Sequence, residues 1–234
     1  MQAVILAGGK GTRLKPYTIC FPKPLVPLGD YSILEIVIRQ LKKHGFNDIQ
    51  ISTGYLSDLI EAYCGKGERW GVKIKYLKES TPLNTAGFLS LMDDCEDNFL
   101  VINGDILTTL NFKKLFDMHK KNRAMATIAV KNRESKIDFG VIKTDKKNFL
   151  SEYQEKPVYD FSVSMGIYVL SKSCRNLLKG EEAIGMPDIF RRIMKAGKKV
   201  YCHKSDCYWL DIGRIDDYEL AQAEFEKYKK KLMG

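Results

Sequence analysis

The sequence is poor in the residues that build zinc centres, and it lacks a membrane-spanning segment. Only three histidines occur, and the six cysteines include no Cys-x-x-Cys pair, so we expect no zinc site. No run approaches the ~18 apolar residues that a bilayer span requires. The first residues show no charged-then-apolar leader. These absences predict a cytoplasmic protein with reduced cysteines and no membrane partner.

The chain also lacks every common nucleic-acid-binding motif, although its formal net charge is +9. Its densest basic patch is the tail Lys227, Lys229, Lys230 and Lys231. No helix-turn-helix, zinc finger or paired aromatic RNA-binding motif accompanies this tail. Lysines also suit the negative end of a terminal helix. We therefore expect polyanionic small substrates and no nucleic acid, with a basic nucleic-acid module as the competing hypothesis.

Strand and helix patterns alternate through the first 130 residues, which is typical of a parallel sheet covered by helices. At 234 residues and 44% hydrophobic, the chain suits a single α/β domain. The patterns predict strands at 3–7, 48–53, 72–77 and 99–102. They predict helices that begin at the Ser32 capping box and end at Gly45, over 57–64 and 84–92, and after the Asn111 cap.

The second part of the chain, from about residue 125, is richer in strand patterns. We expect strands at 125–130, 139–143, 149–154 and 161–170, helices at 171–178, 187–196 and 216–231, and short strands near Val200 and Tyr208. The fold class predicted is α/β, a Rossmann-like, mostly parallel twisted sheet with helices on both faces. The added strands are expected to form a lid over this sheet. No linker or repeat divides residues 1–234.

A glycine-rich turn follows the first predicted strand. Its bare amides, from Gly8 to Arg13, would surround an anion, and Arg13 and Lys23 add two cations. The turn lacks the Gly-Lys-Ser/Thr ending of a Walker loop, and Leu14 replaces the third glycine of the dinucleotide fingerprint. The stretch therefore favours a polyphosphate, and a plain strand followed by a tight turn is the alternative.

Further polar turns follow other strands. Gly54 follows the second strand, and Asn103-Gly104-Asp105 follows the fourth. Ligands of open parallel sheets bind beyond the carboxyl ends of the strands, so these turns are expected to meet in one crevice. Asp105 would suit Mg²⁺, which prefers carboxylates and substrate phosphates. Asn-Gly-Asp is equally a common turn sequence.

The opening stretch resembles the signature of the sugar-1-phosphate nucleotidylyltransferases, which reads Leu-Ala-Gly-Gly-x-Gly-Thr-Arg-Leu, then Pro, Thr and Pro-Lys-Pro-Leu. Every fixed position is filled, at 6–9, 11–14, Pro16, Thr18 and 22–25. The resemblance covers essentially the whole chain and includes bacterial mannose-1-phosphate and D-glycero-D-manno-heptose 1-phosphate guanylyltransferases. It implies the nucleotide-diphospho-sugar transferase fold, which is GT-A-like.

This resemblance implies a nucleotide site in residues 1–130. Arg13 and Lys23 would be the catalytic cations. Asn84 stands where the similar Leu-Gly-Thr-Ala-Gly pattern has glycine. The implied nucleotide-binding residues are Leu6, Ala7, Gly8, Gly9, Gly11, Thr12, Arg13, Asn84, Thr85, Gly87 and Gly104.

It also implies a metal and a sugar-phosphate site. Asp105 and Asp211, the latter in Trp209-Leu210-Asp211-Ile212-Gly213, would hold Mg²⁺. Residues 131–234 would mainly bind the sugar phosphate, through Gly140, the Glu-Lys-Pro triplet at Glu155 and Lys156, and Ser164. Ser164 replaces the asparagine of the usual Asn-Ala-Gly pattern, so the sugar stays open.

The implied partners are a nucleoside triphosphate and a sugar 1-phosphate, and a homo-oligomer is compatible with the sequence. The implied reaction transfers GMP from GTP to mannose or manno-heptose 1-phosphate and gives a nucleotide-sugar and pyrophosphate. A uridylyl-, thymidylyl- or cytidylyltransferase and a catalytically silent nucleotide-sugar sensor are the alternatives. No general base is needed, because the attacking phosphate is already ionised.

Overall fold

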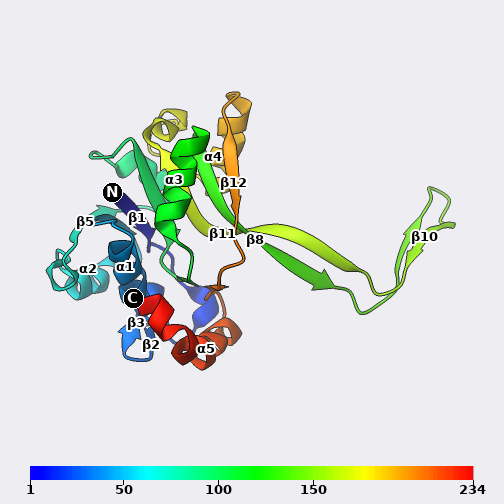
Figure 1. Ribbon diagram of the computed structural model, residues 1–234, viewed down its shortest axis with the longest axis horizontal. Helices are drawn as coiled ribbons and strands as arrows, with labels where there is room; N and C mark the ends of the chain where they lie inside the picture. The colour runs from blue at the N-terminus through cyan, green and yellow to red at the C-terminus, as the bar shows by residue number, and fades with distance from the viewer. Residues whose placement is uncertain (234) are drawn as a thin grey trace.

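The computed structural model describes residues 1–233 and is built on a seven-stranded sheet (Figure 1). The strand order is β12 (Val200–Lys204), β8 (Ala126–Lys136), β11 (Val158–Ser171), β6 (Asn98–Asn103), β1 (Gln2–Leu6), β4 (Asp48–Thr53) and β5 (Lys73–Lys78). Only β11 runs antiparallel to its neighbours in this sheet. The predicted fold class is confirmed, and strands from both sides of residue 130 share one sheet.

The helices follow the predicted pattern closely. They are α1 (Ile33–Lys43), α2 (Ser57–Cys64), α3 (Phe112–Asn122), α4 (Met186–Lys195) and α5 (Ile215–Met233). The Ser32 hydroxyl accepts a hydrogen bond from the Glu35 amide at 3.1 Å, and Asn111 caps α3 in the same way. Both caps satisfy amides that have no partner inside the helix, which is why the sequence located these helix starts.

Alternating side chains of the strands pack into two layers of core. Ala3 and Ile5 of β1 face a cluster shared with α1, α2 and α3, whereas Val4 faces a cluster shared with α4. This is the period of two expected of a strand that is buried on both faces. A third cluster joins α5 to the segment before α1, including Leu14 and Leu28. Residues of α5 thus belong to the same buried cluster as Leu14, which directly follows the glycine-rich turn.

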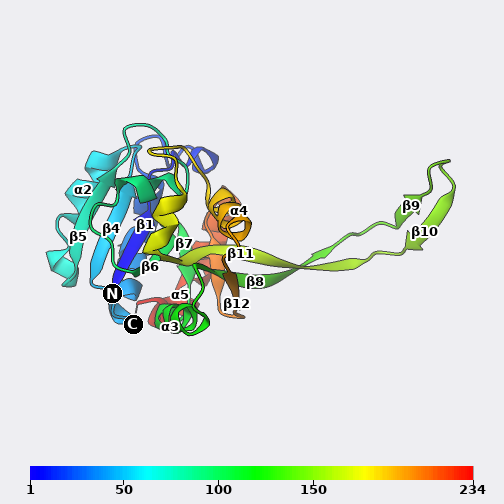
Figure 2. The same ribbon diagram turned by 90° about the horizontal axis from the view of Figure 1, so that it is seen from above.

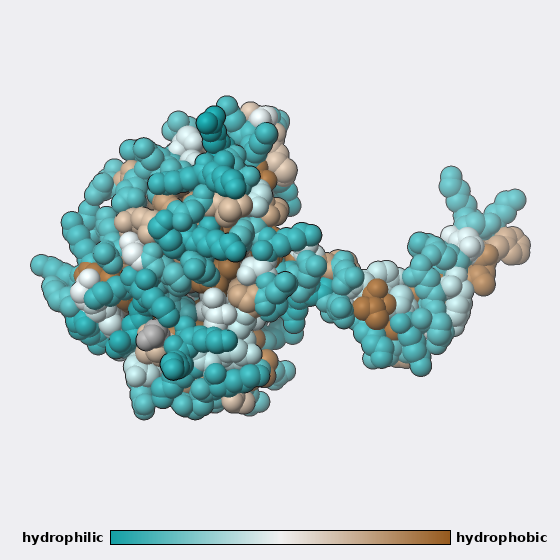
Figure 3. Space-filling model, viewed as in Figure 1, coloured by the Kyte–Doolittle hydropathy of each residue, from teal (hydrophilic) through white to brown (hydrophobic). Residues whose placement is uncertain are grey.

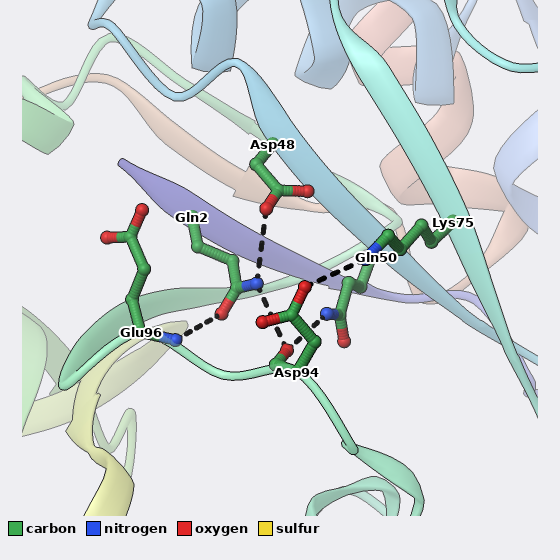
Figure 4. A network of polar contacts seen from close by, with 6 residues as sticks. All are labelled: Gln2, Asp48, Gln50, Lys75, Asp94 and Glu96. Atoms are coloured by element: carbon green, nitrogen blue, oxygen red, sulfur yellow. Dashed lines mark hydrogen bonds and ion pairs between the residues drawn. The ribbon is translucent and has the colours of Figure 1, made fainter.

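A polar network closes the amino end of the sheet (Figure 4). The buried Gln2 side chain donates to Asp48 Oδ2 at 3.4 Å and to the Asp94 carbonyl at 3.3 Å. Gln50 donates to the same carbonyl at 2.8 Å, and Lys75 donates to Asp94 Oδ2 at 2.9 Å. This network fixes the loop before β6 to three neighbouring strands, at the end opposite to the predicted crevice.

Two predicted α-helices are short 3₁₀ helices instead. Residues 84–92 contain the 3₁₀ turn Gly87–Leu91, because Asn84 adopts a left-handed φ of 60° and the Ala86 amide donates to the Ile184 carbonyl. The segment is therefore bonded to a distant loop at Ala86, and only its second half forms a helical turn. Residues 172–177 form the other 3₁₀ helix.

The expected lid over the sheet is wrong. β8 and β11 continue past the sheet as a two-stranded ribbon that ends in the hairpin of β9 (Val141–Thr144) and β10 (Leu150–Gln154), well away from the body (Figures 1 and 2). The pairing runs without a break from Lys131 opposite Val163 to Lys136 opposite Val158, which keeps the two strands together as they leave the sheet. We call residues 131–163 the arm.

The smaller strands and the cysteines complete the description. β2 (Pro27–Leu28) pairs with β3 (Tyr31–Ser32), and β7 (Ile106–Thr108) pairs with β13 (Trp209–Asp211).

All six cysteines are free thiols, three of them buried. Burial raises the pKa of the Cys64 and Cys174 thiols to about 12. Within residues 1–233, no helix is both long and apolar enough to cross a bilayer.

His119 is a buried structural residue of α3. Its Nδ1 lies 2.9 Å from Thr127 Oγ1, and its Nε2 lies 2.9 Å from Asn98 Oδ1. Burial lowers its pKa to about 4, because the charged ring would lose its hydration. His44 and His203 also have lowered pKa values, mainly through burial.

We predict that acid destabilises the fold partly through His119. Between pH 6.5 and about 4 the unfolded chain binds a proton at this residue that the folded chain excludes. The free energy of unfolding therefore falls as pH drops through this window, by up to about 3 kcal/mol. In urea titrations across this range, His119→Gln should show a shallower pH dependence than wild type. An unchanged slope would contradict the assignment, and His203→Gln is the less buried control.

Candidate active site

A cavity of about 330 Å³ opens beyond the carboxyl ends of β1 and β6, where the sequence predicted a crevice. This volume is at the lower end of the range of small-molecule sites. The cavity is lined by Leu6, Ala7, Gly8, Gly9, Lys23, Pro24, Glu79, Pro82, Asn84, Thr85, Asn103, Gly104 and Asp105. Most of the predicted nucleotide-binding residues thus line this one cavity.

The glycine-rich turn is held by close backbone contacts. The Tyr55 amide donates to the Gly8 carbonyl at 3.3 Å, and a Cβ on Gly54 would lie 3.1 Å from that oxygen. Gly11 has a left-handed φ of 60°, and its carbonyl accepts from the Thr18 hydroxyl at 2.7 Å. Among the described residues, Gly11 and Thr12 are not part of the cavity lining, so they shape the turn while Gly8 and Gly9 face the cavity.

Lys23 and Asp105 form an ion pair on the cavity wall, between Lys23 Nζ and Asp105 Oδ2. Their side chains are only 12% and 19% exposed, so water screens the pair weakly. Asp105 Oδ1 is buried and has no hydrogen-bond partner within residues 1–233. One oxygen of this carboxylate is therefore available to a ligand.

Asp211 lies close to Asp105. The sequence alone did not show whether these two residues meet. Asp211 is paired with Ile106 across β13 and β7, and the Ile212 amide donates to the Asp105 carbonyl at 3.1 Å. Burial raises the pKa of the Asp211 carboxyl, and the neighbouring Asp105 charge raises it further. The two carboxylates are thus close enough to interact, Asp105 being largely buried and Asp211 lying at the solvent-exposed rim.

Arg13 approaches the same pair of carboxylates from the Asp211 side. A Cβ on Gly213 would lie 3.5 Å from both terminal nitrogens of Arg13. Lys23 and Arg13 both act to lower the pKa of Asp211, against burial and Asp105. The Gly213 turn is fixed by Asp217 Oδ2, which accepts from the Gly213 amide at 3.1 Å. Arg13 itself is not a lining residue in the described chain.

The carboxylate pair fits a hard divalent cation. No group of three or more His, Cys, Asp or Glu side chains that could hold a metal occurs in residues 1–233. Two carboxylates are nevertheless enough for Mg²⁺, which usually completes its shell with substrate phosphates and water. Asp105 Oδ1 has no partner, and the pKa of Asp211 is raised although Lys23 and Arg13 act to lower it, so the nearby cations do not fully satisfy the two carboxylates.

The segment from Asn84 to Gly87 has mixed roles. The left-handed φ of Asn84 explains why the similar family pattern has glycine there, since asparagine is among the few other residues that tolerate this conformation. Thr85 lines the cavity, and its hydroxyl accepts from the Met186 amide at the start of α4 at 2.9 Å. Gly87 is buried outside the lining, where a Cβ would lie 2.7 Å from the Glu182 carbonyl.

Glu79 is a site residue that the sequence reasoning missed. Its carboxylate accepts from the Ser52 hydroxyl at 2.6 Å and from the Leu83 amide at 3.0 Å, so it ties the loop that carries Asn84 to β4. Glu79 directly follows β5 and lies two residues after the strand predicted at 72–77, so the strand-end rule applied there would have found it. The lining residues Pro24, Pro82 and Asn103 were not proposed as site residues either.

The predicted sugar-phosphate residues are not brought together with the cavity. Gly140, Glu155 and Lys156 lie on the arm, whereas Ser164 lies where the arm joins the body. The Ser164 hydroxyl donates to Tyr168 Oη at 3.2 Å. Gly166, two residues further, packs against Asn103 of the cavity wall. Within one chain, only Ser164 of this set is near the nucleotide side.

Comparison with known sequences identifies relatives over nearly the whole chain. The sequence model of the family described as Nucleotidyl transferase matches residues 2–228. The chain is 31% identical to D-glycero-alpha-D-manno-heptose 1-phosphate guanylyltransferase of Aneurinibacillus thermoaerophilus, over 97% of this chain and 100% of that protein. It is 32% identical to UTP–glucose-1-phosphate uridylyltransferase of Synechocystis sp. and 33% identical to mannose-1-phosphate guanyltransferase of Yarrowia lipolytica. It spans 61% and 62% of their lengths, and the matches cover 93% of this chain in both cases.

Solved structures show the same fold. A Bacillus anthracis protein described as a glucose-1-phosphate thymidylyltransferase, in complex with sucrose, superposes with a TM-score of 0.76 at 25% identity, over 95% of this chain and 94% of that one. HddC from Yersinia pseudotuberculosis, complexed with GMP-PN, superposes with a TM-score of 0.73 at 24% identity, over 96% of this chain and 99% of that one. At that identity the HddC likeness concerns the fold alone.

We predict that alanine substitution at two glycines of this region changes the stability of the fold to different extents. Gly87→Ala forces a Cβ against the Leu83 side chain and the Glu182 backbone, which should cost about 1–3 kcal/mol of stability. Gly9→Ala adds a Cβ in open space and should change stability by less than about 0.5 kcal/mol. Thermal unfolding of both variants measures the difference. Equal melting temperatures would show that the Gly87 contacts are wrong.

Proposed function

The chain belongs to the nucleotidyl transferase family, and from this premise we propose that it transfers a nucleotidyl group from a nucleoside triphosphate to a sugar 1-phosphate. The proposal depends on one arrangement: the Gly8–Gly9 turn, Lys23 and Asp105 line a single cavity, and Asp211 lies against Asp105. Amides, a cation and paired carboxylates are the groups that a bound triphosphate and its metal require.

The proposed reaction is an in-line displacement at the α-phosphorus. An oxygen of the sugar phosphate forms a bond to the α-phosphorus, and the bond from that phosphorus to the bridging oxygen breaks. Pyrophosphate leaves with the electron pair. The attacking oxygen is already ionised, so the chain needs no general base, and none of the three histidines lines the described cavity. Positioning and charge stabilisation remain for the protein to provide.

Lys23 and Arg13 are the proposed cations of this reaction. Lys23 is held at the cavity wall by Asp105, where a phosphate oxygen in the cavity would meet its ammonium group. Arg13 is held beside the Gly213 turn, so the two cations flank the carboxylate pair from different sides. Fixed cations stabilise negative charge that builds on the phosphates, because they need no rearrangement when the charge appears.

Asp105 and Asp211 are the proposed ligands of Mg²⁺. Their oxygens are hard donors, and the unpartnered Asp105 Oδ1 is a free ligand atom. When bound, the ion would neutralise phosphate charge and align the α-phosphate. Lys23 offsets part of the Asp105 charge in the form described here, which keeps two nearby carboxylates tolerable before any ion binds.

For the finer specificity we propose GTP and a manno-configured sugar, mannose or manno-heptose 1-phosphate. The relative that this chain matches along its full length is named as a heptose 1-phosphate guanylyltransferase. The Leu83-Asn84-Thr85-Ala86-Gly87 segment, with Asn84 and Thr85 on the cavity wall, supports the guanylyl assignment. Uridylyl, thymidylyl and cytidylyl transfer are the alternatives, and relatives named for the first two occur among the matches.

A catalytically silent nucleotide-sugar sensor is the second candidate. A protein that only binds would not need both cations and both carboxylates, and this chain retains Arg13, Lys23, Asp105 and Asp211 in one place. That retention favours the enzyme.

We predict that pyrophosphate release distinguishes these readings. The purified chain is tested with Mg²⁺ and each of GTP, UTP, dTTP and CTP against mannose, manno-heptose and glucose 1-phosphates. The fastest release is expected with GTP and a manno-configured sugar. A different preferred base would correct the specificity only. Nucleotide binding without release in any combination would favour the sensor, and binding of oligonucleotides but not of triphosphates would contradict the proposal.

We also predict that Asp105→Asn lowers the rate of pyrophosphate release by about 10²–10³-fold, because it removes charge from the carboxylate pair without changing its size. The fold should survive, which circular dichroism and thermal unfolding verify. Asp93→Asn, an exposed position in the loop at the amino end of the sheet, is the matched control and should keep full activity. Normal turnover of Asp105→Asn would reject the metal assignment.

A further inference from the structure

Beyond its base, where Lys131 donates to the Cys207 carbonyl at 2.7 Å, the arm makes no side-chain polar contact with the rest of the described chain. Within residues 1–233, every side-chain hydrogen bond and ion pair of residues 132–162 is made to another residue of that segment. None of the three core clusters includes an arm residue from 132 to 162. The views in Figures 1 and 2 agree that the hairpin β9–β10 stands far from the body.

The arm is also the most apolar exposed part of the molecule. Brown side chains are visible on the projecting arm in Figure 3. An isolated two-stranded ribbon buries neither face and is marginally stable in water. Large apolar groups on such a ribbon therefore indicate a surface that is covered by something else. Those more than half exposed are Phe139, Ile142, Phe149, Leu150, Tyr153, Val158 and Phe161.

Part of the predicted sugar-phosphate site is assembled on this arm. Gly140 packs directly against the hydroxyl of Tyr153, where a Cβ would collide with it. The same hydroxyl donates to Glu155 Oε2 at 2.8 Å. Lys156 follows in a left-handed conformation, with φ of 45°. Residues from β10 and from the turn before β9 are thus gathered at one end of the ribbon, away from the cavity they would serve.

The cavity of the body lacks the predicted sugar-phosphate residues that lie on the arm. Its cavity is lined by the glycine turn, Lys23 and Asp105 but by no arm residue of the described chain. Beside Lys23, the loop after Pro16 exposes Ile19 at 56% and Phe21 at 59%. Outside the arm, only these two and Met194 are large apolar side chains more than half exposed in residues 1–233. We call Ile19 and Phe21 the second apolar patch, and they belong to the loop that leads to Lys23 of the cavity wall.

We propose that two copies of this chain exchange arms, so that the arm of each copy lies over the cavity of the other and supplies Glu155 and Lys156 to the sugar phosphate. The inference rests on the proposed function for the role of these two residues. One exchange covers both apolar patches, and a two-fold axis repeats it without leaving an open end. The unbroken pairing from Lys131 to Lys136 holds the arm extended, away from its own cavity.

Hybrid dimers test this proposal directly. Two differently tagged chains are co-expressed, and the hybrid is purified through both tags. One chain carries E155Q/K156A and the other carries D105N. With exchanged arms, the intact body receives the intact arm, so the hybrid should keep about half of the wild-type pyrophosphate release, one site of two. If each arm serves its own body, this hybrid is inactive, which would overturn the proposal.

The reciprocal hybrid reverses the expectation. A chain with D105N/E155Q/K156A is paired with a wild-type chain. With exchanged arms both sites contain one defect and the hybrid is inactive. If each arm serves its own body, the wild-type chain keeps about half of the activity of the dimer. Full activity of the homodimer with E155Q/K156A would show that the arm is not part of the site.

A readout without activity separates this proposal from the proposed function. Sedimentation should give a dimer for wild type and a monomer for F139S/F149S, and circular dichroism should show that the monomer keeps its secondary structure, because both side chains are exposed in the single chain. M194S, an equally exposed apolar position on α4, should stay dimeric. A monomeric wild type would overturn the exchange. A dimer that depends on the arm but releases no pyrophosphate would reject the function and leave the exchange of arms standing.

Discussion

Parallel pairing of β1 between β4 and β6 is the constraint on which the site depends. Leu6 is opposite Ser52 on one side and Asn103 on the other, so three strands end at the same level. The chain leaves each of them in a different turn, and those turns carry the glycines and Asp105. β1 is buried on both faces, and a slip of one residue would place Ala3 and Ile5 in the wrong core layer. The same packing that fixes the fold therefore fixes the convergence of the phosphate-binding groups.

Charge is the second constraint, and it is imposed by topology. The antiparallel pairing of β7 with β13 brings Asp211 to Asp105 although the two are distant in sequence. Two neighbouring carboxylates repel each other unless cations accompany them, and Lys23 and Arg13 do so here. Substrate phosphates would add more negative charge to this place. A further cation would offset that charge, which is the role proposed for Mg²⁺.

The sequence could predict what local signals determine. Caps at Ser32 and Asn111 and the apolar run of β1 act within a few residues, and the strand-end rule then located Asp105. The meeting of Asp105 with Asp211 depends on pairing between distant strands, which no local pattern encodes. The segment 84–92 failed as a helix because its Ala86 amide bonds to Ile184. The prediction of a lid was wrong for a different reason. A strand pattern indicates that β8 and β11 form strands, but it does not give the direction in which the paired strands leave the sheet.

The division between body and arm separates two physical demands. The body builds its cavity on packed core layers, where even a change of one methylene is felt. The arm residues from 132 to 162 lie outside that core, so a substitution such as one at Glu155 leaves both core layers unchanged. Within the proposed function, the sugar side of the site is free to vary while the nucleotide side stays fixed. Relatives named for different sugars and bases share this body, and a sugar site on a separate ribbon is a physical means by which one fold serves several sugars.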